Sequence, residues 1–190
     1  MTEVPDATTD DIMTLFEQYG NEDYDGEPVS QASHMIQCAM LAMQEEADDE
    51  LMLAAFLHDI GHLLKHRQAT GAMGTYGVVD HEGIGAVYLR NRGFSDRVCA
   101  VVENHVQAKR YLVAVEPSYK DNLSEASVQT LIWQGGPMKE AEADRFRQHP
   151  FFDDIIRVRI WDEEAKDAHA SILPLEHFRN LIYQHISIQP

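Results

Sequence analysis

A histidine and an aspartate stand side by side at the end of an apolar run. Residues 51–57 read Leu-Met-Leu-Ala-Ala-Phe-Leu, His58 and Asp59 follow, and Gly61 comes next but one. An imidazole nitrogen binds borderline metal ions, and a carboxylate can bind one ion or bridge two. Adjacent helical residues do not share a direction, so the pair suits a helix end. By itself the dipeptide is also explained by a helix terminus with polar cap residues.

Further potential ligands recur at intervals of about one helix plus one connection. The gaps are 24 residues from 34 to 58, 22 from 59 to 81 and 24 from 81 to 105. Facing helices of a bundle can supply inward ligands in this way. The complete set is His34, His58, Asp59, His81, His105 and Asp162. A structural ion needs about four ligands, so six ligands with a bridging carboxylate fit two ions that keep open positions. Nitrogen and oxygen ligation suits iron or manganese and does not exclude zinc.

Helices must position these ligands. Apolar residues recur at helical spacing over residues 9–19, 30–46, 51–59, 80–93, 95–105, 124–133, 139–148, 153–161 and 174–186. Turn residues predict loops at 21–28 and 66–79. No segment alternates as a strand does, and 190 residues suffice for one core. We therefore predict an all-α helical bundle, one domain over residues 1–190, with Trp133 and Trp161 in the core and His185 at the surface.

The charge balance restricts the partners. The chain has 15 basic and 32 acidic residues, a formal net charge of -17. Such a surface repels nucleic acid and anionic membranes, so we expect a small-molecule substrate. We also expect a monomer. Cys38 and Cys99 lie in apolar helical patterns, as reduced thiols of a cytoplasmic protein do. We expect no signal peptide, because no basic region precedes an apolar run at the N-terminus, and no apolar run is long enough to span a membrane.

The order of His34, the pair His58-Asp59 and Asp162 resembles the HD-domain superfamily, an all-helical fold of mostly metal-dependent phosphohydrolases. His81 and His105 resemble the additions of its di-metal members. Over most of its length the chain looks more like the HD-domain mixed-valent di-iron oxygenases. The motifs that carry this likeness are Tyr24-Asp25-Gly26-Glu27, His58-Asp59-Ile60-Gly61-His62, His105-Val106-Gln107-Ala108-Lys109-Arg110, Ser124-Glu125-Ala126-Ser127 and Arg159-Ile160-Trp161-Asp162.

The resemblance implies a cofactor and a reaction. One iron would be held by His34, His58, Asp59 and Asp162, and the second by His81, His105 and the shared Asp59. The resting pair would be Fe(II)/Fe(III), with O2 as co-substrate. The oxygenase would cleave the C–P bond of (R)-2-amino-1-hydroxyethylphosphonate to give glycine and phosphate, a step of organophosphonate catabolism.

The resemblance also implies substrate contacts. His62, Lys109, Ser127 and Thr130 would bind the phosphonate, and His62 would join Asp59 as a catalytic group. Lys109 is one turn beyond His105, and Ser127 is in the first turn of a helix, where free amides favour an anion. Tyr24 and Glu27 would form a lid, Glu27 meeting the substrate ammonium and Tyr24 occupying an iron position until substrate displaces it.

The residues alone leave other interpretations open. Lys109 is also explained as a solvated surface lysine, and Ser127 as an ordinary residue in the first turn of a helix. The segment from Tyr24 to Glu27 is also explained as a mobile acidic loop. The same ligand set fits a metal-dependent phosphohydrolase that acts on a nucleotide or phosphomonoester through a metal-bound hydroxide. A non-catalytic helical module would be expected to have a broken ligand set, and this set is complete. Dependence on O2 separates the oxygenase from the hydrolase.

Overall fold

The computed structural model describes residues 3–24, 26–67 and 78–189. The helices are α1 (Glu3–Tyr19), α2 (Gln31–Gln44), α3 (Asp49–Leu57), α4 (Ile60–Leu63), the 3-10 helix η1 (Leu64–His66), α5 (His81–Arg90), α6 (Asp96–Val115), α7 (Pro117–Asp121), α8 (Glu125–Trp133), α9 (Glu140–Phe146), α10 (Phe152–Glu164) and α11 (Glu176–Ile188). In these ranges extended backbone pairs at isolated bridges, such as the one between Asp23 and Ser30, and not in strands. The all-α prediction is therefore confirmed. Most of the loop expected at residues 66–79 lies outside the described residues.

Serine side chains fix three helix starts that the sequence predicts. Ser30, Ser95 and Ser124 each accept a hydrogen bond from the backbone N–H three residues further on. This satisfies one of the amide groups that a helix start leaves unpaired. Other boundaries differ from the prediction. Thr9, expected as a cap, lies inside α1, and the short helix α7 begins at Pro117, where the prediction had no helix.

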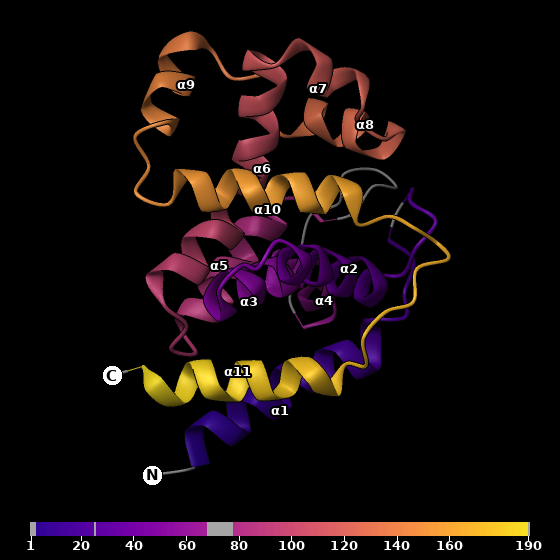
Figure 1. Cartoon of the computed structure of the whole chain (residues 1–190), viewed down its shortest axis with the longest axis vertical. Helices are drawn as coiled ribbons and strands as arrows, with labels where there is room; N and C mark the ends of the chain where they lie inside the picture. The colour runs from indigo at the N-terminus through magenta and orange to yellow at the C-terminus, as the bar shows by residue number, and fades with distance from the viewer. Residues whose placement is uncertain (1–2, 25, 68–77, 190) are drawn as a thin grey trace.

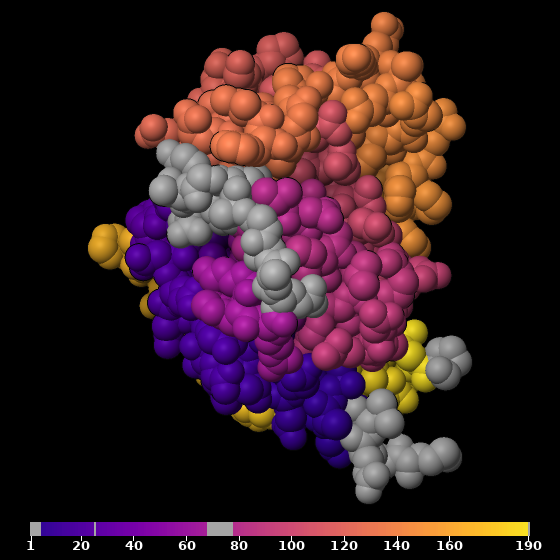
Figure 2. Space-filling view, turned by 180° about the vertical axis from the view of Figure 1, so that it is seen from behind, coloured from indigo at the N-terminus to yellow at the C-terminus, as the bar shows by residue number. Residues whose placement is uncertain are grey.

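The helices form a central group with a smaller group at each end (Figure 1). Helices α7, α8 and α9 gather at one end, beyond α10, and α1 packs against α11 at the other end. Between them, α6 contacts α3, α5 and α10, and α2 contacts α3 and α10. Seen from behind, α11 emerges only at the margin of the surface (Figure 2). Among the described helices, none has the length and apolarity that crossing a membrane requires.

Helix α3 is the centre of the hydrophobic core, which explains its apolar run. Residues 51–57 are all buried. The ring of Phe56 stacks between Phe16 of α1 and Phe178 of α11, with centroids 4.6 and 4.2 Å away. This packing fixes the end of α3, and hence the place of His58. Trp161 is core as predicted, but Trp133 is 62% exposed, because it ends α8 on the outer side of the molecule.

Candidate metal centre

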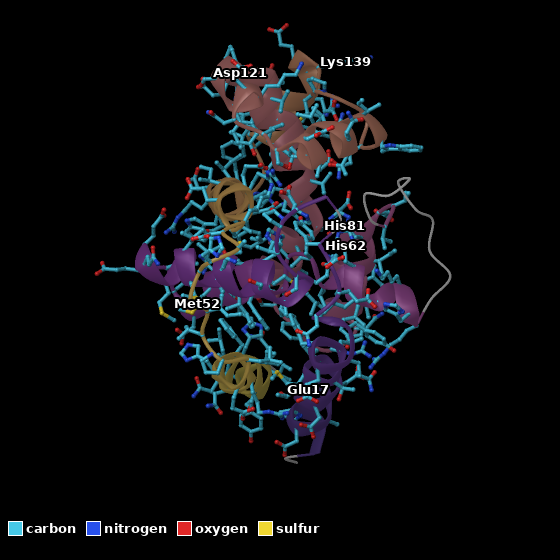
Figure 3. The ribbon with its side chains drawn as sticks, turned by 90° about the vertical axis from the view of Figure 1, so that its right-hand side faces the viewer. Glu17, Met52, His62, His81, Asp121 and Lys139 are labelled. Atoms are coloured by element: carbon cyan, nitrogen blue, oxygen red, sulfur yellow. The ribbon has the colours of Figure 1, made fainter. Side chains whose placement is uncertain are left out.

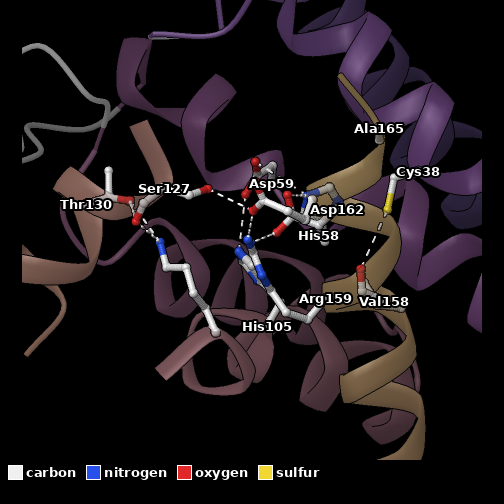
Figure 4. Close-up of polar contacts among 12 residues, drawn as sticks. Cys38, His58, Asp59, His105, Ser127, Thr130, Val158, Arg159, Asp162 and Ala165 are labelled. Atoms are coloured by element: carbon white, nitrogen blue, oxygen red, sulfur yellow. Dashed lines mark hydrogen bonds and ion pairs between the residues drawn. The ribbon is translucent and has the colours of Figure 1, made fainter. Parts of the chain in front are cut away.

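The structure brings all six expected ligands together from different helices. They are His34 in α2, His58 and Asp59 where α3 meets α4, His81 at the start of α5, His105 in α6 and Asp162 in α10. None is more than 4% exposed. His81 lies in the middle of the molecule beside His62, far from the surface residues Asp121 and Glu17 (Figure 3). The close-up shows Asp59 and Asp162 side by side between His58 and His105 (Figure 4).

The carboxylate of Asp59 divides the cluster into two halves. Its Oδ2 lies 3.5 Å from Nε2 of both His34 and His58. Its Oδ1 lies 3.1 Å from Nε2 of His81 and 3.3 Å from Nε2 of His105. Each carboxylate oxygen therefore faces its own pair of imidazoles, which is the arrangement that a bridging ligand needs.

Asp162 belongs to the first half alone. Its Oδ1 lies 3.3 Å from Nε2 of His34 and 3.7 Å from Nε2 of His58. The half with Asp162 thus offers two imidazoles and two carboxylates, whereas the half with His81 and His105 offers two imidazoles and one carboxylate. The second half leaves more positions for a substrate.

The four ring nitrogens that face inward are oriented by hydrogen bonds on the opposite side of each ring. The Nδ1 atoms of His34, His58, His81 and His105 contact the carbonyl oxygens of Ala165, Ala55, Val78 and Val102 at 2.9, 2.8, 3.2 and 2.8 Å. A carbonyl oxygen only accepts, so each Nδ1 carries a hydrogen, and a ring without a second proton turns the lone pair of its Nε2 inward. Metal-bound histidines are held in the same way.

These lone pairs test whether metal ions fit. The Nε2 atoms of His34 and His58 are 3.1 Å apart, and so are those of His81 and His105. Two ligands at right angles on an ion, with bonds of about 2.1 Å, stand about 3.0 Å apart. Two facing lone pairs without a hydrogen or a cation repel each other. The spacing therefore fits a cation in each half.

Both carboxylates also fit a cation. Oδ2 of Asp59 and Oδ1 of Asp162 are buried without a hydrogen-bond partner among the described residues. Burial would raise the pKa of Asp59, but the neighbouring His58 and His105 hold it well below its usual range. Burial acts likewise on Asp162, and there the Arg159 guanidinium holds the pKa low. Buried, ionised and unpaired oxygens are the expected state of metal ligands.

His62 differs from the four histidines that are expected to be ligands. Its Nδ1 lies 3.5 Å from the backbone nitrogen of Val78 and accepts that N–H, so its Nε2 carries the hydrogen. This Nε2 is 4.0 Å from Oδ1 of Asp59, and the ring stacks on His81. Burial and His81 hold the pKa of His62 well below its usual range, so the ring is neutral. His62 is oriented to donate a hydrogen bond beside the centre.

A cavity opens on the second half of the centre. It is lined by Tyr24, Glu27, Gln31, Asp59, His62, His81, His105, Val106, Lys109, Ala126, Ser127, Thr130, Gln134, Arg159 and Asp162. All six residues expected to contact substrate are among them. Lys109 is not a surface lysine: it is 4% exposed, and its Nζ donates to Oγ1 of Thr130 at 2.8 Å. Burial, with Arg159 nearby, lowers the pKa of Lys109 to about 7.

The segment before α2 covers this cavity. The ring of Tyr24 stacks on His34, with centroids 4.1 Å apart. Burial and the charges of Asp59 and Asp162 raise the pKa of the Tyr24 hydroxyl well above its usual range. Glu27 accepts from Ser124 Oγ at 2.5 Å, which ties the segment to the start of α8.

Three residues of the site were given no role by the sequence analysis. Arg159 binds Asp162 and Glu163 and donates to the Tyr119 hydroxyl at 2.7 Å. Nζ of Lys166 contacts Glu27 at 3.0 Å. Gln31 lines the cavity one helical turn before His34.

Two of the three carried a signal in the sequence. Arg159 precedes Asp162 by three residues and Gln31 precedes His34 by three, so each shares a helical face with a ligand. Lys166 follows the end of α10, and no pattern marks its pairing with Glu27 across 139 positions of sequence (166 − 27). His185, expected at the surface, is buried and accepts the N–H of Ser95 at 3.2 Å.

Comparisons with known proteins agree with this geometry. The HD domain family model matches residues 32–132, which hold five of the six residues around the centre and end before Asp162. An uncharacterized protein of Acanthamoeba polyphaga mimivirus is 43% identical over 176 residues, covering 93% of this chain and 80% of that protein. The [1-hydroxy-2-(trimethylamino)ethyl]phosphonate dioxygenase (glycine-betaine-forming) of Leisingera caerulea is 39% identical, covering 88% and 85%. Hydroxymethylphosphonate dioxygenase of Gimesia maris is 36% identical, covering 87% and 82%. The chain belongs to the HD-domain family, in the group that includes these two dioxygenases.

Proposed function

We propose that this protein is a di-iron oxygenase that uses O2 to cleave the C–P bond of (R)-2-amino-1-hydroxyethylphosphonate, giving glycine and phosphate. The observation that carries the proposal is the position of Asp59, whose two oxygens each face a separate pair of imidazoles. Two relatives that cover most of the chain are phosphonate dioxygenases by name, which supports a phosphonate as substrate.

The ligands divide between two irons. His34, His58, Asp162 and Oδ2 of Asp59 would hold one, and His81, His105 and Oδ1 of Asp59 would hold the other. A bound Fe(II)/Fe(III) pair supplies the redox chemistry by which O2 oxidises the substrate at C1. The donor atoms are nitrogen and oxygen, without a thiolate, and such a set supports iron over metals that prefer sulfur ligands.

Different residues of the cavity would bind the phosphonate group and the ammonium group of the substrate. Nζ of Lys109 donates a hydrogen bond of 2.8 Å to Oγ1 of Thr130. A phosphonate oxygen would replace this contact and would accept a hydrogen bond from each of the two residues. Ser127 lies beside them in the first turn of α8, where its helix favours a negative group. The Nε2–H of His62 would donate to the substrate next to Asp59. Glu27 would meet the ammonium, and the Tyr24 ring would shield the centre from water.

The decisive experiment is anaerobic iron reconstitution followed by low-temperature EPR, with and without the substrate. We expect a signal of a coupled Fe(II)/Fe(III) pair that changes when the substrate is added. Phosphate should be released only after O2 is admitted. Absence of the mixed-valent signal, with phosphate released from phosphomonoesters under anaerobic conditions, would instead assign the site to a phosphohydrolase.

A further inference from the structure

The amide of Gln31 is a buried polar group that the proposed chemistry does not yet use. Gln31 is the first residue of α2 and is 2% exposed. It lines the same cavity as Tyr24 and Glu27, the two residues of the covering segment. A buried amide in a binding cavity needs partners for both of its ends.

One end of this amide is satisfied and fixes the orientation of the group. Its nitrogen donates to the backbone carbonyl of Asp23 at 3.3 Å. A carbonyl oxygen accepts only, so the amide cannot be turned the other way without losing this bond. The other atom is therefore the oxygen Oε1, and it has no hydrogen-bond partner within the described parts of the chain. Such an atom calls for a donor on the ligand.

The contacts of the Glu27 carboxylate, which lines the same cavity, make Oε1 of Gln31 more important for binding a ligand nitrogen. Oε1 of Glu27 is held by Lys166 at 3.0 Å and by the hydroxyl of Ser124 at 2.5 Å. The positive charge of Lys166 offsets the charge of Glu27, so Glu27 attracts a ligand cation less by charge alone. A ligand nitrogen that carries hydrogens can bind Glu27 and also Gln31.

A trimethylammonium group would gain little in this cavity. It has no N–H to donate, and proteins bind such groups in cages of aromatic rings. Among the described residues that line the cavity, Tyr24 is the one phenol ring, and the other rings are the imidazoles of His62, His81 and His105. The lining thus offers acceptors rather than an aromatic cage.

We propose that Oε1 of Gln31 accepts a hydrogen bond from the substrate nitrogen and thereby selects an ammonium that carries N–H groups over a trimethylammonium. This inference rests on the proposed function and names the substrate class of that same cavity. It makes Gln31 a specificity-determining residue that acts together with Glu27.

The test compares ligands that differ at the nitrogen. The iron-loaded protein is titrated anaerobically with 2-aminoethylphosphonate and with its N,N,N-trimethyl derivative, in calorimetry, for the natural chain and for Gln31→Met. The natural chain should bind the primary amine at least about ten-fold more tightly, the effect of one hydrogen bond to a charged group. Gln31→Met should lose most of that preference. Gln31→Glu keeps an oxygen at this place and should retain it.

Kinetics supply a second readout. Gln31→Met should lower kcat/KM for 2-amino-1-hydroxyethylphosphonate through KM, and leave kcat/KM for hydroxymethylphosphonate, which has no nitrogen, within about two-fold. Equal losses on both substrates, or tighter binding of the trimethyl ligand by the natural chain, would refute the role of Gln31. No turnover of any phosphonate, with the binding preference intact, would refute the proposed function and leave this inference standing.

Discussion

The Nε2 atoms of His34 and His58 face each other at 3.1 Å while the opposite nitrogen of each ring is bound to a backbone carbonyl. With a hydrogen on each outer nitrogen, the two inward nitrogens face each other with lone pairs, so the contact needs a proton or a metal ion between them. The backbone at the end of α10 and within α3 holds both rings in place, since Ala165 and Ala55 supply the carbonyls. The two rings and the carboxylates beside them are thus arranged to surround positive charge.

Metal removal should therefore destabilise the protein. Chelation of the iron-loaded protein should lower Tm, because a ligand present at 100 times its Kd adds about 2.7 kcal/mol to the free energy of unfolding. Asp162→Asn should reduce the bound iron from two per chain towards one, since Asp162 faces only the His34–His58 half. Asp121→Asn, on the exposed surface of α7, is the matched control. Full iron content in Asp162→Asn by metal analysis would contradict the assignment.

Glu27 should act on the nitrogen end of the substrate. Glu27→Ala should raise KM for the amino substrate about ten-fold and change KM for a deaminated analogue much less, because only the former presents a cation. Steady-state kinetics with both substrates measure this difference. Glu22→Ala is the control: it lies in the same segment, but Glu22 pairs with Lys65 and does not line the cavity. Equal effects of Glu27→Ala on the two substrates would exclude the ammonium role.

The sequence predicted the helices and the residues around the centre for one physical reason. Helix periodicity and caps are local, so Ser30, Ser95 and Ser124 mark starts that the structure shares. The gaps between His34, His58 and the later histidines follow from helix lengths, which are local too.

Relations between distant segments could not be predicted in this way. Trp133 is the last residue of α8. The elements packed against α8 decide which of its faces is buried, and the Trp133 ring lies on an exposed face. The Lys166–Glu27 pair depends on how α10 ends beside the segment before α2. His185 is buried because the packing of α11 places its ring against Ser95, whose backbone N–H it accepts. Each of these outcomes is decided by tertiary packing.

Lys109 should give the reaction a pH dependence. Burial lowers the pKa of Lys109 to about 7, so the free protein loses this positive charge as the pH rises through neutrality. The phosphonate needs the charged form, and kcat/KM should therefore fall above about pH 7. Lys109→Arg remains charged and should move the decline to higher pH. Lys109→Met should lose roughly ten-fold or more in kcat/KM at pH 6.5. An unchanged profile in Lys109→Arg would show that another group titrates.

His185 should make the protein less stable in acid. Burial lowers its pKa from 6.5, and the neutral ring accepts the N–H of Ser95. The unfolded chain therefore binds the proton first, so the free energy of unfolding falls as the pH drops below about 6.5. His185→Gln keeps an acceptor and cannot be protonated, so denaturant unfolding at pH 7 and pH 5.5 should show a smaller loss. His169→Gln, at an exposed site, should lose as much as the natural chain. The same loss in both variants would rule out His185.

Gly61 should be essential to the second half of the centre. A Cβ atom built on Gly61 would lie 2.0 Å from the backbone carbonyl oxygen of His81, so the start of α5 would have to move away from α4. Gly61→Ala should therefore cost about 1–3 kcal/mol in the free energy of unfolding and displace His81 from Asp59. Iron bound by His81 and His105 should be lost before the other iron, which metal analysis and EPR would detect. Gly136→Ala is the matched control, because a Cβ there meets open space, although its positive φ adds strain of its own. Normal iron content in Gly61→Ala, with unchanged Tm, would mean that α5 tolerates the shift and that this close approach does not position His81.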